Sequence, residues 1–221
     1  MTNDYFELGI VVTGVGLSQK ALEPFMDTLY SHTVSFPFYL KVVMEKDYGD
    51  FNPDTYSQSK AKNIGIRECI RMQIPVIVCT DIDYLIPNGL TDFTVRETRA
   101  SHLWVQRREV TTDEMHLLDW FGWMHRPVRT SCTGSWNSLS LNNWLRLGGW
   151  DERCFGWGGE DDILHRRIQR KGIPTRVSTV FPLMHIRHNP RAFCANGKRA
   201  QANLSFAHTP QQNYLKEALN A

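Results

Sequence analysis

The sequence lacks the cysteine spacing of a disulfide framework or of a structural zinc site. Its 221 residues include five cysteines, an odd number, and none of them forms a CxxC pair. Small disulfide-rich secreted domains and zinc modules depend on paired or closely spaced cysteines. We therefore expect the chain to fold in a reducing compartment, and we predict a cytoplasmic location.

Long apolar runs and a strong excess of one charge are missing as well. No stretch approaches the roughly 18 apolar residues of a membrane span, and the first seven residues are polar and acidic. We therefore expect no integral membrane segment. The formal net charge of +2 is too small to indicate a nucleic-acid-binding protein. Internal repeats and low-complexity segments are absent, so we expect one domain over residues 1–221.

The first 90 residues alternate between strand-like and helix-like hydrophobic patterns. Short apolar runs predict strands, and the segments between them carry apolar residues at helical spacing. Alternation of this kind favours an α/β fold with a mixed, mostly parallel sheet flanked by helices, in which ligands bind beyond the C-terminal strand ends. The expected strands are 8–14, 38–44 and 74–79, and the expected helices are 17–30 and a segment from Ser59.

The second half of the chain gives a weaker pattern. Glycine after a run of apolar residues at helical spacing indicates a helix end, and acids before such a run indicate a helix start. The polar tail 191–221 is expected to order only when a ligand binds. The expected elements are a strand over 102–105, short helices over 113–124 and 137–147, a helix from Glu160 and a last strand over 173–180.

Asp81 and Asp83 follow the most apolar of the expected strands. One residue separates them, so in an extended backbone both side chains project to the same side. Two close carboxylates favour a hard divalent cation that bridges to a phosphate. Two acids entering a loop are the more common meaning of such a pair, but the position at a strand end favours a metal site. His188 and His185 are the downstream candidates for a further ligand.

The most unusual stretch spans residues 148–162 and contains five glycines and two tryptophans. This glycine density beside large aromatics indicates a surface that receives a ligand. Three acids follow, Glu160, Asp161 and Asp162. Acids in a first helical turn each stabilise a helix by about 0.3–1 kcal/mol, which is the simpler explanation for them. That explanation does not cover the glycines and Trp157 before them, and an indole beside carboxylates suits a sugar.

Together these motifs resemble glycosyltransferases with the GT-A fold, over most of residues 8–190. The segment 148–162 is similar to the C-terminal motif of β-1,4-galactosyltransferases, chondroitin-polymerase-type enzymes and relatives of family 2. Residues 61–65 (Ala-Lys-Asn-Ile-Gly) are similar to the family's A-R-N-x-G, and Asp81 and Asp83 to its DxD. The resemblance implies a Rossmann-like α/β fold with a nucleotide-binding half over about 8–90 and an acceptor-binding half over about 130–190.

The resemblance also implies a metal site and a nucleotide site. Asp83 is expected to bind manganese, or magnesium, with Asp81 near the ribose or a metal-bound water and His188 as the ligand histidine. His185 and Arg187 are second choices for metal or phosphate. The family's Asp-Asp-x-Ser is absent after the second strand, and lysine replaces its usual arginine. The expected nucleotide-binding residues are Thr13, Glu45, Asp47, Lys62, Asn63 and Asp81.

For catalysis, the resemblance makes Asp161 the base that deprotonates the acceptor hydroxyl. Glu160 and Asp162 match acids that hold the acceptor or donor sugar. We expect Glu160 to be a catalytic residue as well. Trp157 matches a tryptophan that packs on sugar and moves with a closing loop, which includes Gly158 and Gly159.

The implied function is a metal-dependent inverting glycosyltransferase. It moves a hexose or N-acetylhexosamine from a UDP-sugar to a hydroxyl on a glycan, a lipid-linked sugar, a protein or a modified nucleic acid. Nucleic acid is a partner only as an acceptor. Two alternatives stay open, a metal-dependent phosphohydrolase or nuclease that uses the same acids, and a non-catalytic carbohydrate-binding protein. The sequence does not indicate an oligomeric state.

Overall fold

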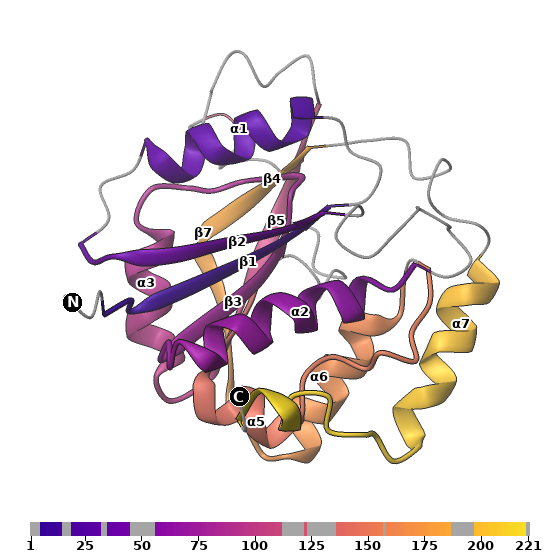
Figure 1. Ribbon diagram of the computed structural model, residues 1–221. Helices are drawn as coiled ribbons and strands as arrows, with labels where there is room; N and C mark the ends of the chain where they lie inside the picture. Colours follow the sequence, from indigo (N-terminus) through magenta and orange to yellow (C-terminus); the bar gives the residue numbers. More distant parts are fainter. Residues whose placement is uncertain are drawn as a thin grey trace.

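Seven strands form a sheet that carries helices on both faces (Figure 1). The structure is a computed structural model, and it describes residues 5–14, 19–31, 35–44, 56–111, 122, 136–156, 158–186 and 197–219. The strands are β1 (Leu8–Gly14), β2 (Phe38–Met44), β3 (Val76–Asp81), β4 (Tyr84–Leu85), β5 (His102–Val110), β6 (Trp136–Ser140) and β7 (Thr175–Ile186). The helices are α1 (Gln19–Tyr30), α2 (Gln58–Arg71), α3 (Leu90–Thr98), α5 (Leu141–Leu147), α6 (Glu160–Arg170) and α7 (Gly197–Ser205), with 3₁₀ turns η4 (Phe206–His208) and η5 (Lys216–Leu219).

The strand order is β2-β1-β3-β6-β5-β7-β4. β1 pairs in parallel with β2 and β3, and β5 pairs in parallel with β7. β6 is antiparallel to β3 and β5, and β4 is antiparallel to β7. Five of the seven strands therefore run in one direction, and the predicted α/β fold with a mixed, mostly parallel sheet is confirmed.

Alternation along β1 divides the core into two layers. Ile10 and Val12 belong to a buried cluster that includes side chains of α1 and α3, whereas Val11 belongs to a cluster that includes side chains of α2, α5 and α6. Successive residues of a strand point to opposite faces, so a strand apolar at every position must be covered on both sides. The continuous apolar runs in the sequence are explained by this burial.

Most of the predicted elements are confirmed, and one prediction is partly wrong. Residues 137–147 were predicted to be a helix, but the chain forms β6 up to Ser140 and only then α5. The strand is favoured because β6 lies between β3 and β5 and bonds to both, with Trp136 and Leu139 in opposite core layers. Ser140 then caps α5 by accepting a hydrogen bond from the backbone of Asn143, and Gly148 ends the helix with φ 75° as predicted.

The C-terminal tail is also different from its prediction. Residues 197–219 form α7 and two 3₁₀ turns, and Ala207, Leu215 and Ala218 are buried. Leu215 and Ala218 lie in the same core layer as α2 and α6. The tail is therefore part of the folded core, because its few apolar residues fill the space beside α2. The helix predicted over 113–124 falls outside the described residues except for Gly122.

The described helices are short. The longest, α2, has 14 residues, and none of the described helices is long and apolar enough to cross a membrane.

Gly65 permits the close packing of α2 on β1, and its substitution is a test of this core. A Cβ at Gly65 would lie 2.4 Å from Cγ1 of Val11. Helix propensity alone predicts that Gly65→Ala stabilises the protein by about 1 kcal/mol. We expect instead a loss of about 1–3 kcal/mol in the free energy of unfolding, because the methyl group overpacks the core. Urea denaturation measures the change.

The exposed position Arg71 on the same helix serves as the control, since Arg71→Ala leaves the core unchanged. Val11→Ala combined with Gly65→Ala should recover part of the loss because it removes the two clashing methyl groups. A stabilised Gly65→Ala protein would contradict this packing.

Candidate active site

The parallel strands β1 and β3 end side by side, and their last residues hold an acid in place. Thr13 is paired in register with Asp81, and its hydroxyl donates a hydrogen bond of 2.9 Å to Oδ1 of Asp81. Nε2 of Gln58, the first residue of α2, donates to the same oxygen at 2.5 Å. Thr13 is buried, so in this structure its hydroxyl positions Asp81, and its nucleotide contact stays a prediction. This strand edge is where open α/β sheets bind ligands.

Asp83 lies against His185. Nε2 of His185 is 2.9 Å from Oδ2 of Asp83, and both residues are buried. The antiparallel pairing of β4 with β7 places Tyr84 opposite His185, and the backbone amide of Ile186 donates to the carbonyl of Asp83. Residues 102 positions apart in the chain are therefore brought together by strand pairing.

The aspartates of the DxD sequence do not share one extended segment as predicted. β3 ends at Asp81, and Ile82 and Asp83 form a turn that leads into β4. The turn separates their partners, since Asp81 faces Thr13 and Gln58 whereas Asp83 faces His185. Burial raises the pKa of Asp81; Lys62 opposes the rise, and the charge of Asp83 adds to it.

Lys62 joins the strand-end acids to the acidic motif of α6. Its Nζ lies 3.4 Å from Oδ1 of Asp81 and 3.8 Å from Oδ1 of Asp161, and the side chain is fully buried. The ammonium also sits 4.3 Å from the centroid of the Trp150 ring, which is a cation–π contact. Two acids 80 positions apart in the sequence thus share one buried cation.

The charge of Lys62 is maintained by these carboxylates. Burial on its own lowers the pKa of the Lys62 ammonium, but Asp81, Asp161 and Glu160 outweigh burial and raise this pKa above its ordinary value. A buried ammonium is otherwise costly, because the charged form loses its hydration. Lys62 is therefore a permanent cation in the middle of the site.

The carboxylates of α6 emerge from a glycine turn. Gly158 and Gly159 have φ angles of 101° and 89°, a region that residues with a Cβ rarely adopt, and Gly159 is the N-cap of α6. Glu160 is buried, whereas the Asp161 side chain keeps 24% of its surface exposed. The glycines therefore bring the chain into α6 at an angle that places Asp161 beside Lys62 and still open to solvent.

Glu160 and Asp161 differ in acidity. Burial raises the pKa of Glu160 to about 8, and the neighbouring Asp161 adds to the rise. Burial raises the pKa of Asp161 to about 6, even though Lys62 acts in the opposite direction. Burial thus favours the protonated form of both carboxyls, and Asp161, which lies beside Lys62, is the more readily ionised of the two. Two adjacent carboxyl groups with separated pKa values can serve as a hydrogen-bond donor and a base.

The first half of the glycine-tryptophan stretch is scaffold and not a ligand surface. Asn63 is fully buried, and its amide donates to the carbonyl of Trp150 at 3.0 Å and accepts from the amide of Trp150 at 2.8 Å. Gly149 has φ 84°, and a Cβ there would lie 2.5 Å from Oδ1 of Asn63. Asn63 therefore fixes Trp150, whose ring lies against the Lys62 ammonium, and its nucleotide contact stays a prediction.

Three residues near the site carry no recognisable sequence signal. Gln58 bonds to Asp81, as described above, but glutamine at a helix start is common. Nη1 of Arg107 donates to the hydroxyl of Tyr84 at 2.9 Å, and the Tyr84 ring lies 5.1 Å from that of His185. The charge of Arg107 also acts on Asp161. Only the pairing of β5 with β7 brings Arg107 to the acids, so no local motif marks it.

Several predicted site residues fall outside the described residues. They are Glu45, Asp47, Trp157, Arg187 and His188. Their predicted roles stay predictions. Asp162, in the first turn of α6, is exposed beside Asp161.

The donor atoms at the strand end fit a divalent metal ion. Asp83 and His185 offer a carboxylate oxygen and an imidazole nitrogen in contact with each other, and manganese accepts both types of donor. Within the described ranges, no cluster of three or more His, Cys, Asp and Glu side chains is present. The pair therefore supplies part of a coordination shell, to which His188 is the predicted addition.

Comparison with known proteins relates the C-terminal part of the chain to one family. A family model described as the N-terminal domain of galactosyltransferase matches residues 123–189. β-1,4-Galactosyltransferase 1 from Homo sapiens is 25% identical over 201 residues, which cover 86% of this chain and 46% of that protein. The Mus musculus enzyme is 26% identical over 151 residues, which cover 64% of this chain and 34% of that protein. The chain thus spans less than half the length of these relatives.

Solved structures extend the similarity to the whole fold. The catalytic domain of Drosophila β1,4-galactosyltransferase 7, solved with xylobiose, superposes with a TM-score of 0.62 at 14% identity and covers 93% of this chain and 82% of that one. GalNAc-T7, solved with UDP, GalNAc and Mn²⁺, has a TM-score of 0.62 at 10% identity and covers 92% and 48%. The chain has the GT-A glycosyltransferase fold. The predicted resemblance to GT-A glycosyltransferases is confirmed.

Within this GT-A fold, the buried Lys62 can be tested through stability. Lys62→Met leaves Asp81, Asp161 and Glu160 without their cation, so we expect a loss of about 3–5 kcal/mol in the free energy of unfolding at pH 8. The loss should be smaller at pH 5. Without Lys62 the folded-state pKa values of these carboxyls rise further above their unfolded values, so stability is retained at low pH and lost as pH rises.

Lys60→Met is the matched control, because Lys60 lies on the same helix and is exposed. Chemical denaturation of both variants at the two pH values measures the effect. An equal loss at pH 5 and pH 8 would show that Lys62 contributes packing instead of charge.

Proposed function

We propose that this protein is a metal-dependent inverting glycosyltransferase that moves a hexose or N-acetylhexosamine from a UDP-sugar to an acceptor hydroxyl. The observation that carries the proposal is the contact of Lys62 with both Asp81 and Asp161. It joins the strand-end acids, where a GT-A fold binds the donor, to the acids of α6, where the acceptor is expected. Donor and acceptor groups therefore meet in one site.

Asp161 is the proposed base. It is partly exposed and lies beside the Lys62 ammonium, which favours its ionised form, so it can take the proton of an acceptor hydroxyl as that oxygen attacks the anomeric carbon. The bond from the anomeric carbon to the diphosphate oxygen breaks in the same displacement, which inverts the configuration. Glu160, whose pKa is raised by burial, is the proposed hydrogen-bond donor to a sugar oxygen.

Asp83, with His185 beside it, is the proposed holder of manganese. A divalent ion bound there supplies positive charge that stabilises the departing diphosphate. Lys62 orients Asp81 and Asp161 from its buried position. In this proposal Lys62 does not need to contact the diphosphate. His188 stays a predicted ligand.

The substrates of the solved relatives support this choice of donor and acceptor class. A Drosophila β1,4-galactosyltransferase 7 mutant was solved with manganese, UDP-Gal and xylobiose, at a TM-score of 0.54. UDP-galactose and a β-linked oligosaccharide are therefore the first donor and acceptor to assay. The rival phosphohydrolase reading gains no support, since the described residues offer one acid–histidine pair and no gathering of acids for two metals.

The cytoplasmic location is also a proposal. It rests on the scattered cysteines, of which Cys69, Cys79 and Cys154 are free and buried. The single-domain organisation over 1–221 stays a prediction as well.

Replacing the proposed base gives a direct test. We expect Asp161→Asn to lower the rate of sugar transfer by roughly 10²–10⁴-fold, since this is the usual contribution of a general base. Binding of UDP with manganese should be unchanged, because the donor end of the site keeps Asp81 and Asp83. A radiolabelled transfer assay and calorimetric titration with UDP and manganese measure the two quantities.

Asp27→Asn is the matched control, because Asp27 is an exposed aspartate on α1. Transfer retained in Asp161→Asn would remove Asp161 from the role of base. Loss of UDP binding would indicate a misfolded site.

The proposed metal site predicts a specific role for His185. We expect His185→Gln to weaken manganese binding about 10–100-fold, whether the imidazole binds the metal itself or only orients Asp83. Electron paramagnetic resonance of free Mn²⁺ in the presence of UDP measures the affinity. His208→Gln, an exposed histidine in η4, should leave it unchanged. Equal affinity in both variants would place the metal elsewhere.

A further inference from the structure

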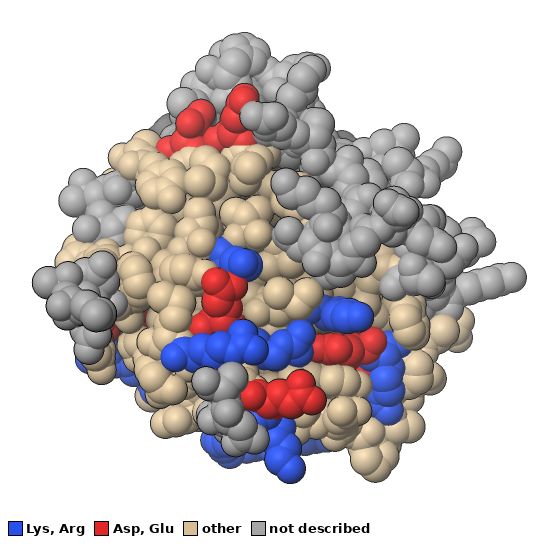
Figure 2. Space-filling model, viewed as in Figure 1, with Lys and Arg blue, Asp and Glu red and all other residues tan. Residues whose placement is uncertain are grey.

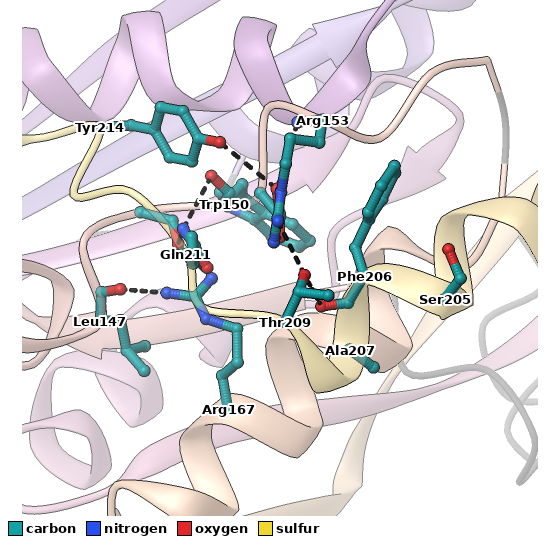
Figure 3. Close-up of polar contacts among 12 residues, drawn as sticks. Leu147, Trp150, Arg153, Arg167, Ser205, Phe206, Ala207, Thr209, Gln211 and Tyr214 are labelled. Carbon is teal, nitrogen blue, oxygen red and sulfur yellow. Dashed lines mark hydrogen bonds and ion pairs between the residues drawn. The ribbon is translucent and has the colours of Figure 1, made fainter.

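A cavity lies at the opposite end of α6 from the acids. It has a volume of about 320 Å³ and is walled by α5, the last turns of α6 and the segment from η4 to Asn213. Arg170 follows Glu160 by ten residues, so at a rise of 1.5 Å per residue the two ends are about 15 Å apart. The cavity is therefore separate from the candidate active site. Figure 3 shows part of its wall, with Arg167 reaching from α6 toward Leu147.

The walls of this cavity are strongly cationic. Four of the residues that line it are Arg146, Arg167, Arg170 and Lys171, and no Asp or Glu is among the lining residues. The pKa of Arg167 is lowered by burial to about 10, so this guanidinium still carries its charge at neutral pH. The nearby carboxylate of Asp151 is bound to Arg153 through two nitrogens.

Backbone carbonyls hold the guanidinium groups in place without neutralising them. Arg167 donates to the carbonyls of Gly149, at 2.7 Å, and of Leu147. Arg170 donates to the carbonyl of Ala207, and Nη2 of Arg146 donates to that of Lys171 at 3.0 Å. A carbonyl accepts a hydrogen bond but carries no formal charge, so these contacts leave the positive charge of the arginines in place. The carboxylate of Asp151, which is paired with Arg153, also acts on Arg167.

Several of the described basic residues elsewhere in the protein are paired with acids. Figure 2 shows acidic and basic residues side by side in a band across the face where α2 lies in Figure 1. Arg67 with Glu152, and Lys41 with Glu68, are ion pairs of this kind. Among the described residues, Arg146, Arg167, Arg170 and Lys171 form no ion pair of this kind, and clustered arginine and lysine side chains are suited to bind a phosphate.

The rest of the lining suits a ligand that also carries hydroxyl groups. Gln211 lies beside the Arg167 guanidinium (Figure 3). Both side chains donate to the carbonyl of Gly149. Oε1 of Gln211 is buried and accepts no hydrogen bond from any described residue. Thr209, Gln212 and Asn213 add polar groups. A volume of 320 Å³ is at the lower end of small-molecule sites and larger than a phosphate ion needs.

We propose that this cavity binds a soluble phosphorylated sugar, with the phosphate against the arginines and Lys171 and the sugar hydroxyls against Gln211 and its polar neighbours. The site goes beyond the proposed transferase activity and does not depend on it. No residue of the candidate active site lines the cavity.

The test is calorimetric titration of the full chain with glucose 1-phosphate, without any donor substrate. EDTA in the buffer removes divalent metal, so that binding at the Asp83 site is suppressed. Glucose and inorganic phosphate are titrated separately at the same ionic strength. The pocket variant is Arg146→Gln combined with Lys171→Gln, two exposed positions whose substitution leaves the half-buried Arg167 in place. The matched control is Arg166→Gln combined with Lys216→Gln, which removes two exposed cations outside the cavity.

We expect saturable binding of glucose 1-phosphate that is tighter than that of inorganic phosphate, with no binding of glucose. The pocket variant should bind about tenfold more weakly or worse, because charge-assisted hydrogen bonds are lost, and the control should bind as the wild type does. Circular dichroism and thermal melting establish that both variants are folded. Absence of binding by the wild type, or an equal weakening in both double variants, would overturn the proposal. Its failure would leave the transfer assay unaffected.

Discussion

A buried ammonium group holds the centre of this molecule together. Lys62 reaches from α2 to Asp81 at the end of β3 and to Asp161 at the start of α6, and it rests on the ring of Trp150. Burying several carboxylates together is unfavourable unless a cation is buried with them. The positions of β3 and α6 therefore depend on one side chain. The same arrangement that stabilises the buried carboxylates also gives Glu160 and Asp161 different pKa values.

The glycine-tryptophan stretch divides into two parts with different purposes. Gly149 and Trp150 are fixed by Asn63, so the first part supports Lys62 from below. Gly158 and Gly159 turn the backbone so that α6 starts at the site. Glycine is required in both parts, at one point for a close approach of the Asn63 side chain and at the other for a left-handed backbone. One continuous stretch of sequence thus contributes both to the scaffold and to the candidate active site.

The two ends of α6 have opposite electrostatic character. Glu160, Asp161 and Asp162 lie in its first turn, and Arg167 and Arg170 lie in its last. Both groups complement the helix dipole, which explains in part why acids lie at the first turn and arginines at the last turn. The dipole does not account for the burial of Glu160 or for the convergence of cations from α5 as well as α6 on one cavity. Each end therefore has features beyond those of a well-capped helix.

The sequence by itself determined the α/β class, most of the strands, and the acids at the end of β3 and the start of α6, because hydrophobic periodicity and glycine spacing are local properties. Only the tertiary structure decided that β6 is a strand, because β6 forms its backbone hydrogen bonds with the two flanking strands, β3 and β5. It also decided that Asn63 supports Trp150, that His185 meets Asp83, and that Arg107 approaches the acids. These contacts depend on strand order and register, which join residues distant in the chain and leave no local pattern.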